Sequence, residues 1–152
     1  MPLEIDSIIV ENPTLFFQTI QDNASETSLP TVDVYESIVG NRTEVLLSNF
    51  VVVGTSLKYI GENPIKLMFN CAVAWEAGGT LNARYKIALF KNGTSSGKVE
   101  GTLDNSNAWP RNVSLNGIVD LIEDDILDLK VSNESNTQSV LIIDLLFNGS
   151  SI

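Results

Sequence analysis

Apolar and polar residues alternate along most of this chain, and the longest clear run lies between Ile65 and Glu76. One parity of this run carries the apolar residues Ile65, Leu67, Phe69, Cys71, Val73 and Trp75. The other parity carries Lys66, Met68, Asn70, Ala72 and Ala74. Because side chains of a strand point alternately to opposite faces, the run predicts a β-strand with one apolar face. The middle of the opposite face carries no charge, which predicts that both faces are covered.

The segment from Asn112 to Asn133 predicts two further strands that flank an acidic turn. Apolar residues share one parity in its first half (Val113, Leu115, Val119, Leu121) and again in its second half (Leu127, Leu129, Val131). Between them stand three adjacent carboxylates, Glu123, Asp124 and Asp125, which repel one another and favour a hydrated turn. We therefore expect a strand–turn–strand unit of one antiparallel sheet, with a dry face and a wet face.

The remaining apolar segments also have the length and composition of strands. They are Thr14–Ile20, Val32–Val39, Arg84–Lys91 and Ser139–Phe147, the last with apolar residues on both faces. Asn92-Gly93 is a strong signal for a hairpin turn, and the polar residues 95–110 predict a strand pair with a loose loop. No segment of convincing length has the helical period of 3.6 residues. The pattern predicts an all-β protein.

The chain length of 152 residues fits one domain, which should bury roughly 70 % of the surface that its unfolded chain exposes. We place this domain at residues 14–152. Residues 1–13 are predicted to be a leader that ends at the turn-favouring dipeptide Asn12-Pro13. The leader has acidic residues where a signal peptide needs basic ones, so we expect synthesis in a reducing cytoplasm.

Charge and composition exclude several classes of function. The chain has 9 Lys+Arg against 19 Asp+Glu, a formal net charge of -10, which argues against nucleic acid or an anionic membrane as the main partner. It has no histidine, which excludes Ser-His-Asp catalysis and a histidine-ligated metal. Cys71 is the only cysteine, so no disulfide forms within the chain. Its place on an apolar parity predicts a small buried filler.

The acidic turn is the first place to look for chemistry. Glu123, Asp124 and Asp125 are the candidate metal ligands, but three consecutive carboxylates cannot all point at one ion, and the calcium-loop pattern is absent. We expect a solvated turn without a metal. No sequence feature places paired carboxylates in a cleft or a phosphate loop before a helix, so we predict no enzyme activity and no cofactor. Trp75 is predicted to lie in the core, whereas Trp109, in a polar loop, is a candidate exposed partner contact.

Several short motifs follow one another in an order that carries a resemblance. They are QDNASET at Gln21–Thr27, SNF at Ser48–Phe50, SLKYIG at Ser56–Gly61, FKNGT at Phe90–Thr94, LNGIVDL at Leu115–Leu121 and VSNES at Val131–Ser135. Together they resemble the jelly roll of complement globular heads and tumour-necrosis-factor-like proteins, and most closely its viral and bacteriophage versions. The resemblance covers about residues 14–148. Asp124 stands where the family commonly has a glycine.

The resemblance implies an antiparallel jelly-roll sandwich of about eight to ten strands that assembles as a homotrimer. The alternation agrees, because a lone sandwich buries one face of each sheet, whereas Ile65–Glu76 and Ser139–Phe147 each have two faces without charge in the middle, with Asp144 as the sole interruption. We expect the trimer interface to include Met68, Asn70, Ala72, Ala74, Leu145 and Phe147.

For a viral module of this kind, the expected function is capsid decoration. The chain would be a trimeric, non-enzymatic cement or knob protein on the virion surface, made in the host cytoplasm and bound to the major capsid protein. The apolar leader residues are the expected capsid-docking residues, namely Ile5, Ile8, Ile9 and Val10. Two alternatives stay open: the receptor-binding tip of a phage fibre or spike, and a cytokine-like trimeric ligand. A fibre would be expected to show coiled-coil or collagen repeats, and this sequence has none.

Overall fold

The computed structural model describes residues 14–79, 82–105 and 111–152, with the backbone alone for residues 96–105 and 111. In this part of the chain every regular element is a β-strand, as the alternation predicted. The strands are β1 (Leu15–Ile20), β2 (Glu36–Ser37), β3 (Thr43–Ser48), β4 (Phe50–Val53), β5 (Ser56–Tyr59), β6 (Ile65–Ala77), β7 (Ala83–Lys91), β8 (Thr94–Asn105), β9 (Arg111–Leu121), β10 (Ile126–Asn133) and β11 (Val140–Ser151).

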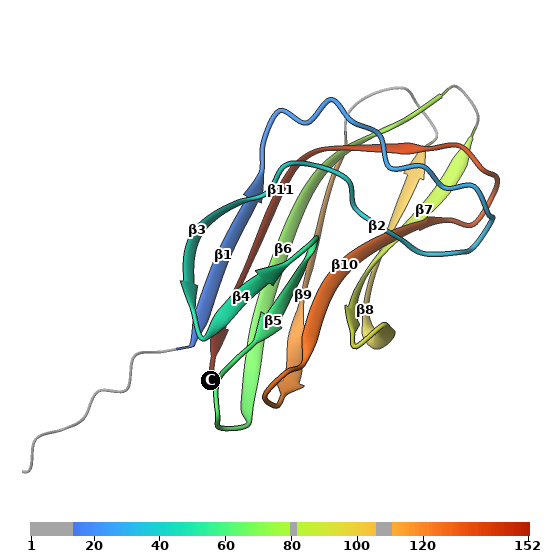
Figure 1. The fold of residues 1–152 in the computed structure, drawn as a ribbon. Coiled ribbons are helices and arrows are strands. Elements are labelled where there is room, and N and C mark those ends of the chain that lie inside the picture. Colours follow the sequence, from blue (N-terminus) through green and yellow to red (C-terminus); the bar gives the residue numbers. More distant parts are fainter. Residues whose placement is uncertain (1–13, 80–81, 106–110) are drawn as a thin grey trace, which may run out of the picture.

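The strands form two antiparallel sheets that face each other as a sandwich (Figure 1). One sheet has the order β3-β1-β11-β6-β9 and is called the β11 sheet. The other has the order β4-β5-β10-β7-β8, with β2 paired to β10, and is called the β10 sheet. The chain crosses from one sheet to the other after β1, β2, β3, β5, β6, β8, β9 and β10, which is the strand exchange of a jelly roll.

The core lies between the two sheets, and the predicted apolar parities face it. On the apolar parity of β6, every residue from Leu67 to Trp75 is at most 2 % exposed, namely Leu67, Phe69, Cys71, Val73 and Trp75. Trp75 packs edge-on against Tyr85 of β7, with ring centroids 5.4 Å apart. The prediction that Cys71 and Trp75 are core residues is confirmed, because alternation fixes which face of a strand is buried.

The acidic turn after β9 crosses between the sheets, so the prediction of a unit within one sheet is wrong. β9 pairs with β6 in the β11 sheet, and β10 pairs with β7 in the β10 sheet. Leu115 and Leu121 of β9 and Leu127 and Leu129 of β10 are buried as expected. The alternation is the same for a hairpin and for an arch between sheets, because both point their apolar residues at one core.

A bulge in β11 reverses the faces of that strand. Its register with β6 shifts between Ile142 and Asp144, which leaves Ile143 without an opposite residue. After the bulge, Leu145 and Phe147 point into the core and are 2 % and 1 % exposed. The expectation that these two residues lie in a trimer interface is therefore wrong, because one extra residue shifts the alternation by one.

Three other segments differ from the expectations. Val32–Val39 contains only the two-residue β2, residues 94–105 form one strand instead of a strand pair, and the last strand continues to Ser151. The predicted leader and the loop with Trp109 lie outside the described residues, and with them the candidate docking residues Ile5, Ile8, Ile9 and Val10.

Candidate functional site

The free face of the β11 sheet is built from uncharged residues. The strand register places them in three central rows across β3, β1, β11, β6 and β9. These rows are Ser48, Leu15, Ser150, Met68, Ile118; Leu46, Phe17, Asn148, Asn70, Asn116; and Thr43, Thr19, Leu146, Ala72, Ser114. None of these fifteen residues is charged, although the chain has 19 acidic and 9 basic residues. We call them the uncharged face.

Large apolar side chains on this face are open to solvent in the single chain. Met68 and Ile118 pair across β6 and β9 and are 50 % and 54 % exposed. Leu46, on the edge strand β3, is 52 % exposed, and its neighbour Phe17 is half-buried. Clustered apolar side chains on an otherwise charged surface are typical of an interaction site.

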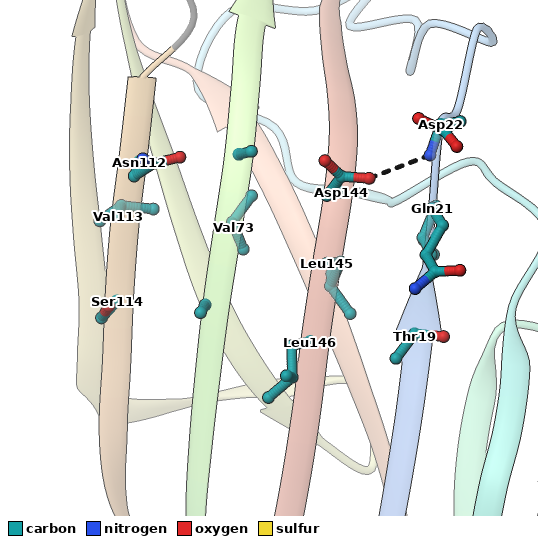
Figure 2. Close-up of a pocket in the computed structure, with 13 residues that line it drawn as sticks. Thr19, Gln21, Asp22, Val73, Asn112, Val113, Ser114, Asp144, Leu145 and Leu146 are labelled. Atoms are coloured by element: carbon teal, nitrogen blue, oxygen red, sulfur yellow. Dashed lines mark hydrogen bonds between the residues drawn. The ribbon is translucent and has the colours of Figure 1, made fainter.

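A shallow groove of about 580 Å³ crosses the uncharged face from β1 to β9 (Figure 2). Ala72 and Ala74 of β6 line it, and their small side chains leave room beside Leu146 of β11. At the rim, the backbone N–H of Asp22 donates to Oδ1 of Asp144 at 2.9 Å. This bond ties the segment after β1 to the bulged part of β11 and fixes one border of the groove.

Charges flank the uncharged face at both ends of the sheet. At one end, Nζ of Lys66 lies 2.7 Å from Oδ1 of Asp120 on the neighbouring strand β9. Both side chains of this pair are exposed, so it adds little stability. At the other end, the exposed Asp144 follows the bulge. Two copies of the chain can therefore meet across the middle of this face without placing like charges in contact.

One of the three rows contains an asparagine on each of three adjacent strands. Asn148 of β11 is opposite Asn70 of β6, and Asn70 is opposite Asn116 of β9. None of the three side chains has a hydrogen-bond partner among the described residues. An amide both donates and accepts, so this row can pair with the same row of another copy.

Sequence reasoning found one strand of this face and missed the others. The structure places three of the four predicted interface residues of β6 on it, namely Met68, Asn70 and Ala72, and it places the fourth, Ala74, at the border of this face, opposite Asp144. Their part in an interface stays a prediction. Phe17 and Ile118 were missed, and the available signal was an apolar residue at the parity opposite the core residues of the same strand. On β11, Leu146 takes the place expected for Leu145, because of the bulge.

The acidic turn holds together two loops at one end of the sandwich. Asp125 is 5 % exposed; its Oδ2 accepts the Ile122 N–H at 2.9 Å, and its Oδ1 accepts the Asn92 amide at 2.6 Å. Oδ1 of Asn92 accepts the Ile126 N–H at 2.8 Å. The expected solvated turn is therefore wrong for Asp125, although its two acidic neighbours are exposed. We call this arrangement the Asn92–Asp125 clamp.

The electrostatics of the clamp favour a charged carboxylate. Burial by itself raises the pKa of Asp125, but the Ile122 N–H, the Asn92 amide and the Lys91 ammonium outweigh it, so this pKa lies below its usual value. Asp124 has a φ of 73°, the left-handed conformation that glycine adopts most easily. The backbone conformation and the hydrogen bonds thus fix the shape of the turn, and we assign its residues a structural role.

Metal and thiol chemistry have little basis in the described residues. In residues 14–79, 82–105 and 111–152, no group of three or more His, Cys, Asp or Glu side chains is arranged to hold a metal ion. Burial raises the pKa of the Cys71 thiol to about 12, and the thiolate is the reactive form. Within the same residues, the structure has no helix of the length and apolarity needed to cross a membrane.

No protein-family model matches the chain, and no curated protein matches its sequence. Solved structures do resemble it. The globular domain of zebrafish complement 1qA has a TM-score of 0.56 at 12% identity, over 93% of this chain and 98% of that chain. Murine APRIL has a TM-score of 0.55 at 12% identity, over 91% of this chain and 99% of that chain. Rabbit GITRL has a TM-score of 0.51 at 16% identity, over 90% of this chain and 93% of that chain.

These similarities concern the fold, and they give no support for a viral origin. APRIL and GITRL are tumour-necrosis-factor-family ligands. The agreement extends over nearly the whole of each chain, so it includes both sheets of this chain. The chain therefore has the antiparallel jelly-roll fold of tumour-necrosis-factor-like proteins and complement globular heads.

Proposed function

We propose that this chain assembles as a homotrimer through the uncharged face and works as a non-enzymatic, multivalent binding module. The observation that carries this proposal is the composition of that face. A free face of a domain with a net charge of -10 would be expected to hold charges in its middle, and this one holds none. A stable interface uses about 20–30 residues a side. The fifteen residues of the uncharged face supply a large part of such a surface.

The chemistry of the face suits contact with further copies of the same chain. Elsewhere on the domain, like charges of identical copies repel one another. On this face, alanines permit close approach, apolar residues such as Met68 and Ile118 lose exposed area, and the asparagine row offers matching donors and acceptors. Identical copies that meet at this face therefore bring the fewest like charges together and bury the most apolar surface.

The number of copies and the class of function rest on the likeness of fold. Folds of this type assemble as homotrimers, which supports three copies over two. Two of the similar structures are tumour-necrosis-factor-family ligands, so the cytokine-like alternative has more support than capsid decoration. We therefore favour a trimeric ligand that binds a partner at a surface and has no catalytic function.

Capsid decoration remains a second proposal, supported by the sequence motifs alone. Segments such as LNGIVDL at Leu115–Leu121 and FKNGT at Phe90–Thr94 resemble viral jelly rolls most closely. In this version the partner is the major capsid protein and the location is the virion surface. The candidate docking residues of the leader and the candidate partner contact Trp109 belong to segments outside the described residues. The fibre-tip alternative has the same support from the motifs.

One matched pair of proteins separates these functions. Labelled wild-type protein and Ala72→Asp, which should be monomeric, are offered to animal cells and to phage particles stripped of surface proteins. A multivalent ligand keeps the wild type on cells and releases the monomer, because avidity is lost. Retention on particles and not on cells would favour decoration, and deletion of residues 2–12 would then test the leader. Equal retention of both proteins would contradict the multivalent mode.

A further inference from the structure

One lateral edge of the sandwich is apolar and open. β3 ends the β11 sheet, β4 ends the β10 sheet, and the two strands follow one another through Asn49 (Figure 1). The exposed fractions on β4 are 38 % for Val51, 39 % for Val52 and 48 % for Val53, and Val45 of β3 is 63 % exposed. An exposed apolar edge strand invites pairing with another chain, and proteins usually cover such an edge.

Strand β4 also points backbone groups at this open edge. The Ile60 N–H donates to the Asn49 carbonyl at 2.9 Å, and β4 pairs with β5 from there to the hairpin turn. Bonded pairs alternate along an antiparallel ladder, so Val51 and Val53 direct their backbone groups toward β5. The N–H and C=O groups of Phe50 and Val52 therefore point away from β5. Among the described residues, no strand pairs with that side of β4.

The described chain begins at the same corner. Nδ2 of Asn49 donates to Oγ1 of Thr14 at 2.9 Å, so Thr14, the first described residue, lies beside the start of β4 (Figure 1). The leader holds three consecutive branched residues, Ile8–Val10, and its last three residues can span about 10 Å. It reaches the corner from which β4 departs, and a strand that it formed along β4 would be antiparallel.

We propose that residues 5–12 of the leader cover this edge in their own chain as an added antiparallel strand on β4. The apolar run Ile8–Val10 then lies beside the apolar run Val51–Val53, and the backbone groups of Phe50 and Val52 gain partners. Asn12-Pro13 turns the chain at the corner, where Pro13 needs no hydrogen bond. The proposal is independent of the trimer, because no residue of β4 belongs to the uncharged face.

Amide hydrogen exchange, read residue by residue by nuclear magnetic resonance, tests this arrangement. In the full chain the Val52 N–H should be protected, and deletion of residues 2–12 should speed its exchange at least about tenfold. The N–H groups of Val51 and Val53 serve as internal controls, because they point at β5 in both proteins. The triple variant Ile8→Asp, Ile9→Asp, Val10→Asp should expose Val52 in the same way.

A matched charge variant completes the test. Glu4→Gln, Asp6→Asn and Glu11→Gln together change the charge of the leader and keep its apolar run, so Val52 should stay protected. Equal exchange of Val52 with and without the leader would overturn the proposal. Protection that disappears when the full chain is diluted would also overturn it, because the covering strand would then come from another copy.

Discussion

At the scale of single residues, Ala72 offers the sharpest test of the uncharged face. It lies in the middle of β6, between Leu146 of β11 and Ser114 of β9, with no charged residue in its row. An aspartate there would be buried between subunits without a partner, which costs about 3–5 kcal/mol. We predict that Ala72→Asp raises the dissociation constant of the trimer at least about 100-fold, as measured by analytical ultracentrifugation.

The control for Ala72→Asp is Thr137→Asp, which adds the same charge at an exposed position in the turn before β11. It should leave the assembly unchanged. Both variants should keep the same far-ultraviolet circular dichroism, because neither position belongs to the core. An Ala72→Asp protein that assembles like the wild type would mean that this face is free in the assembly.

Cys71 tests the depth of the core. Its side chain is fully buried and the pKa of its thiol is raised to about 12, so a thiol reagent at pH 8 should label native protein at least about 100-fold more slowly than unfolded protein. The folded state also keeps this proton where the unfolded thiol, with its ordinary pKa of 9.0, loses it. The stability that depends on Cys71 is therefore complete below about pH 9 and falls as the pH rises toward 12.

The pH dependence is measured against Cys71→Ala. Above pH 9, the unfolding free energy of the wild type should fall by roughly 1 kcal/mol per pH unit more than that of the variant. Parallel pH profiles, or rapid labelling of the native protein, would show that the register of β6 is shifted by one residue.

At the scale of elements, two neighbouring residues of β11 serve different purposes, one in the core of the subunit and the other in the proposed contact between subunits. Phe147 points into the core, where its ring centroid lies 4.6 Å from that of Phe16. Leu146 points to the uncharged face. Phe147→Ala should lower the unfolding free energy by about 3–5 kcal/mol. Leu146→Ala should weaken assembly and cost the isolated subunit less than about 1 kcal/mol. Urea unfolding at low protein concentration measures the loss of unfolding free energy in each variant. A larger loss for Leu146→Ala than for Phe147→Ala would place the bulge elsewhere.

The Asn92–Asp125 clamp gives a second prediction at this scale. Asn92→Ala removes the amide that donates to Oδ1 of Asp125 and the oxygen that accepts the Ile126 N–H, and alanine strains a backbone whose φ is 52°. We predict a loss of about 2–3 kcal/mol in urea unfolding at pH 7. Asn92→Gly relieves the strain and still lacks the amide, so its loss should be smaller. Equal stability of Asn92→Ala and wild type would show that the clamp is dispensable.

The clamp should also make stability depend on acid. The pKa of Asp125 is lowered in the folded state, so its contribution is present above the ordinary value of 3.8 and is lost as the pH falls through the folded value. Asp125→Asn should flatten this acid dependence.

Much of the fold follows from alternation, and the exceptions have local causes. The buried parities of β6, β7, β9 and β10 were predictable because a core-facing strand must alternate. The bulge at Ile143 was not, because Val140–Leu146 is apolar at both parities apart from Asp144, and an extra residue leaves no clear mark in such a run. The arch after β9 was mistaken for a hairpin because both bury the same residues. Burial of Asp125 depends on Asn92, which lies 33 positions away in the sequence.

At the scale of the whole molecule, charge and assembly are coupled. Each subunit carries a net charge of -10, so three of them repel one another at long range while the contact itself is uncharged. Added salt screens this repulsion over about 8–10 Å at ordinary ionic strength. Association through the uncharged face should therefore tighten as salt rises from low to moderate concentration, whereas an interface held by ion pairs would weaken.

The most direct measurement is the mass of the full chain in solution, by light scattering coupled to size exclusion at micromolar concentration and moderate salt. We expect a single species of three times the 16.6 kDa chain mass, and a smaller species for Ala72→Asp. A wild-type protein that elutes as a clean monomer under these conditions would contradict self-association through the uncharged face.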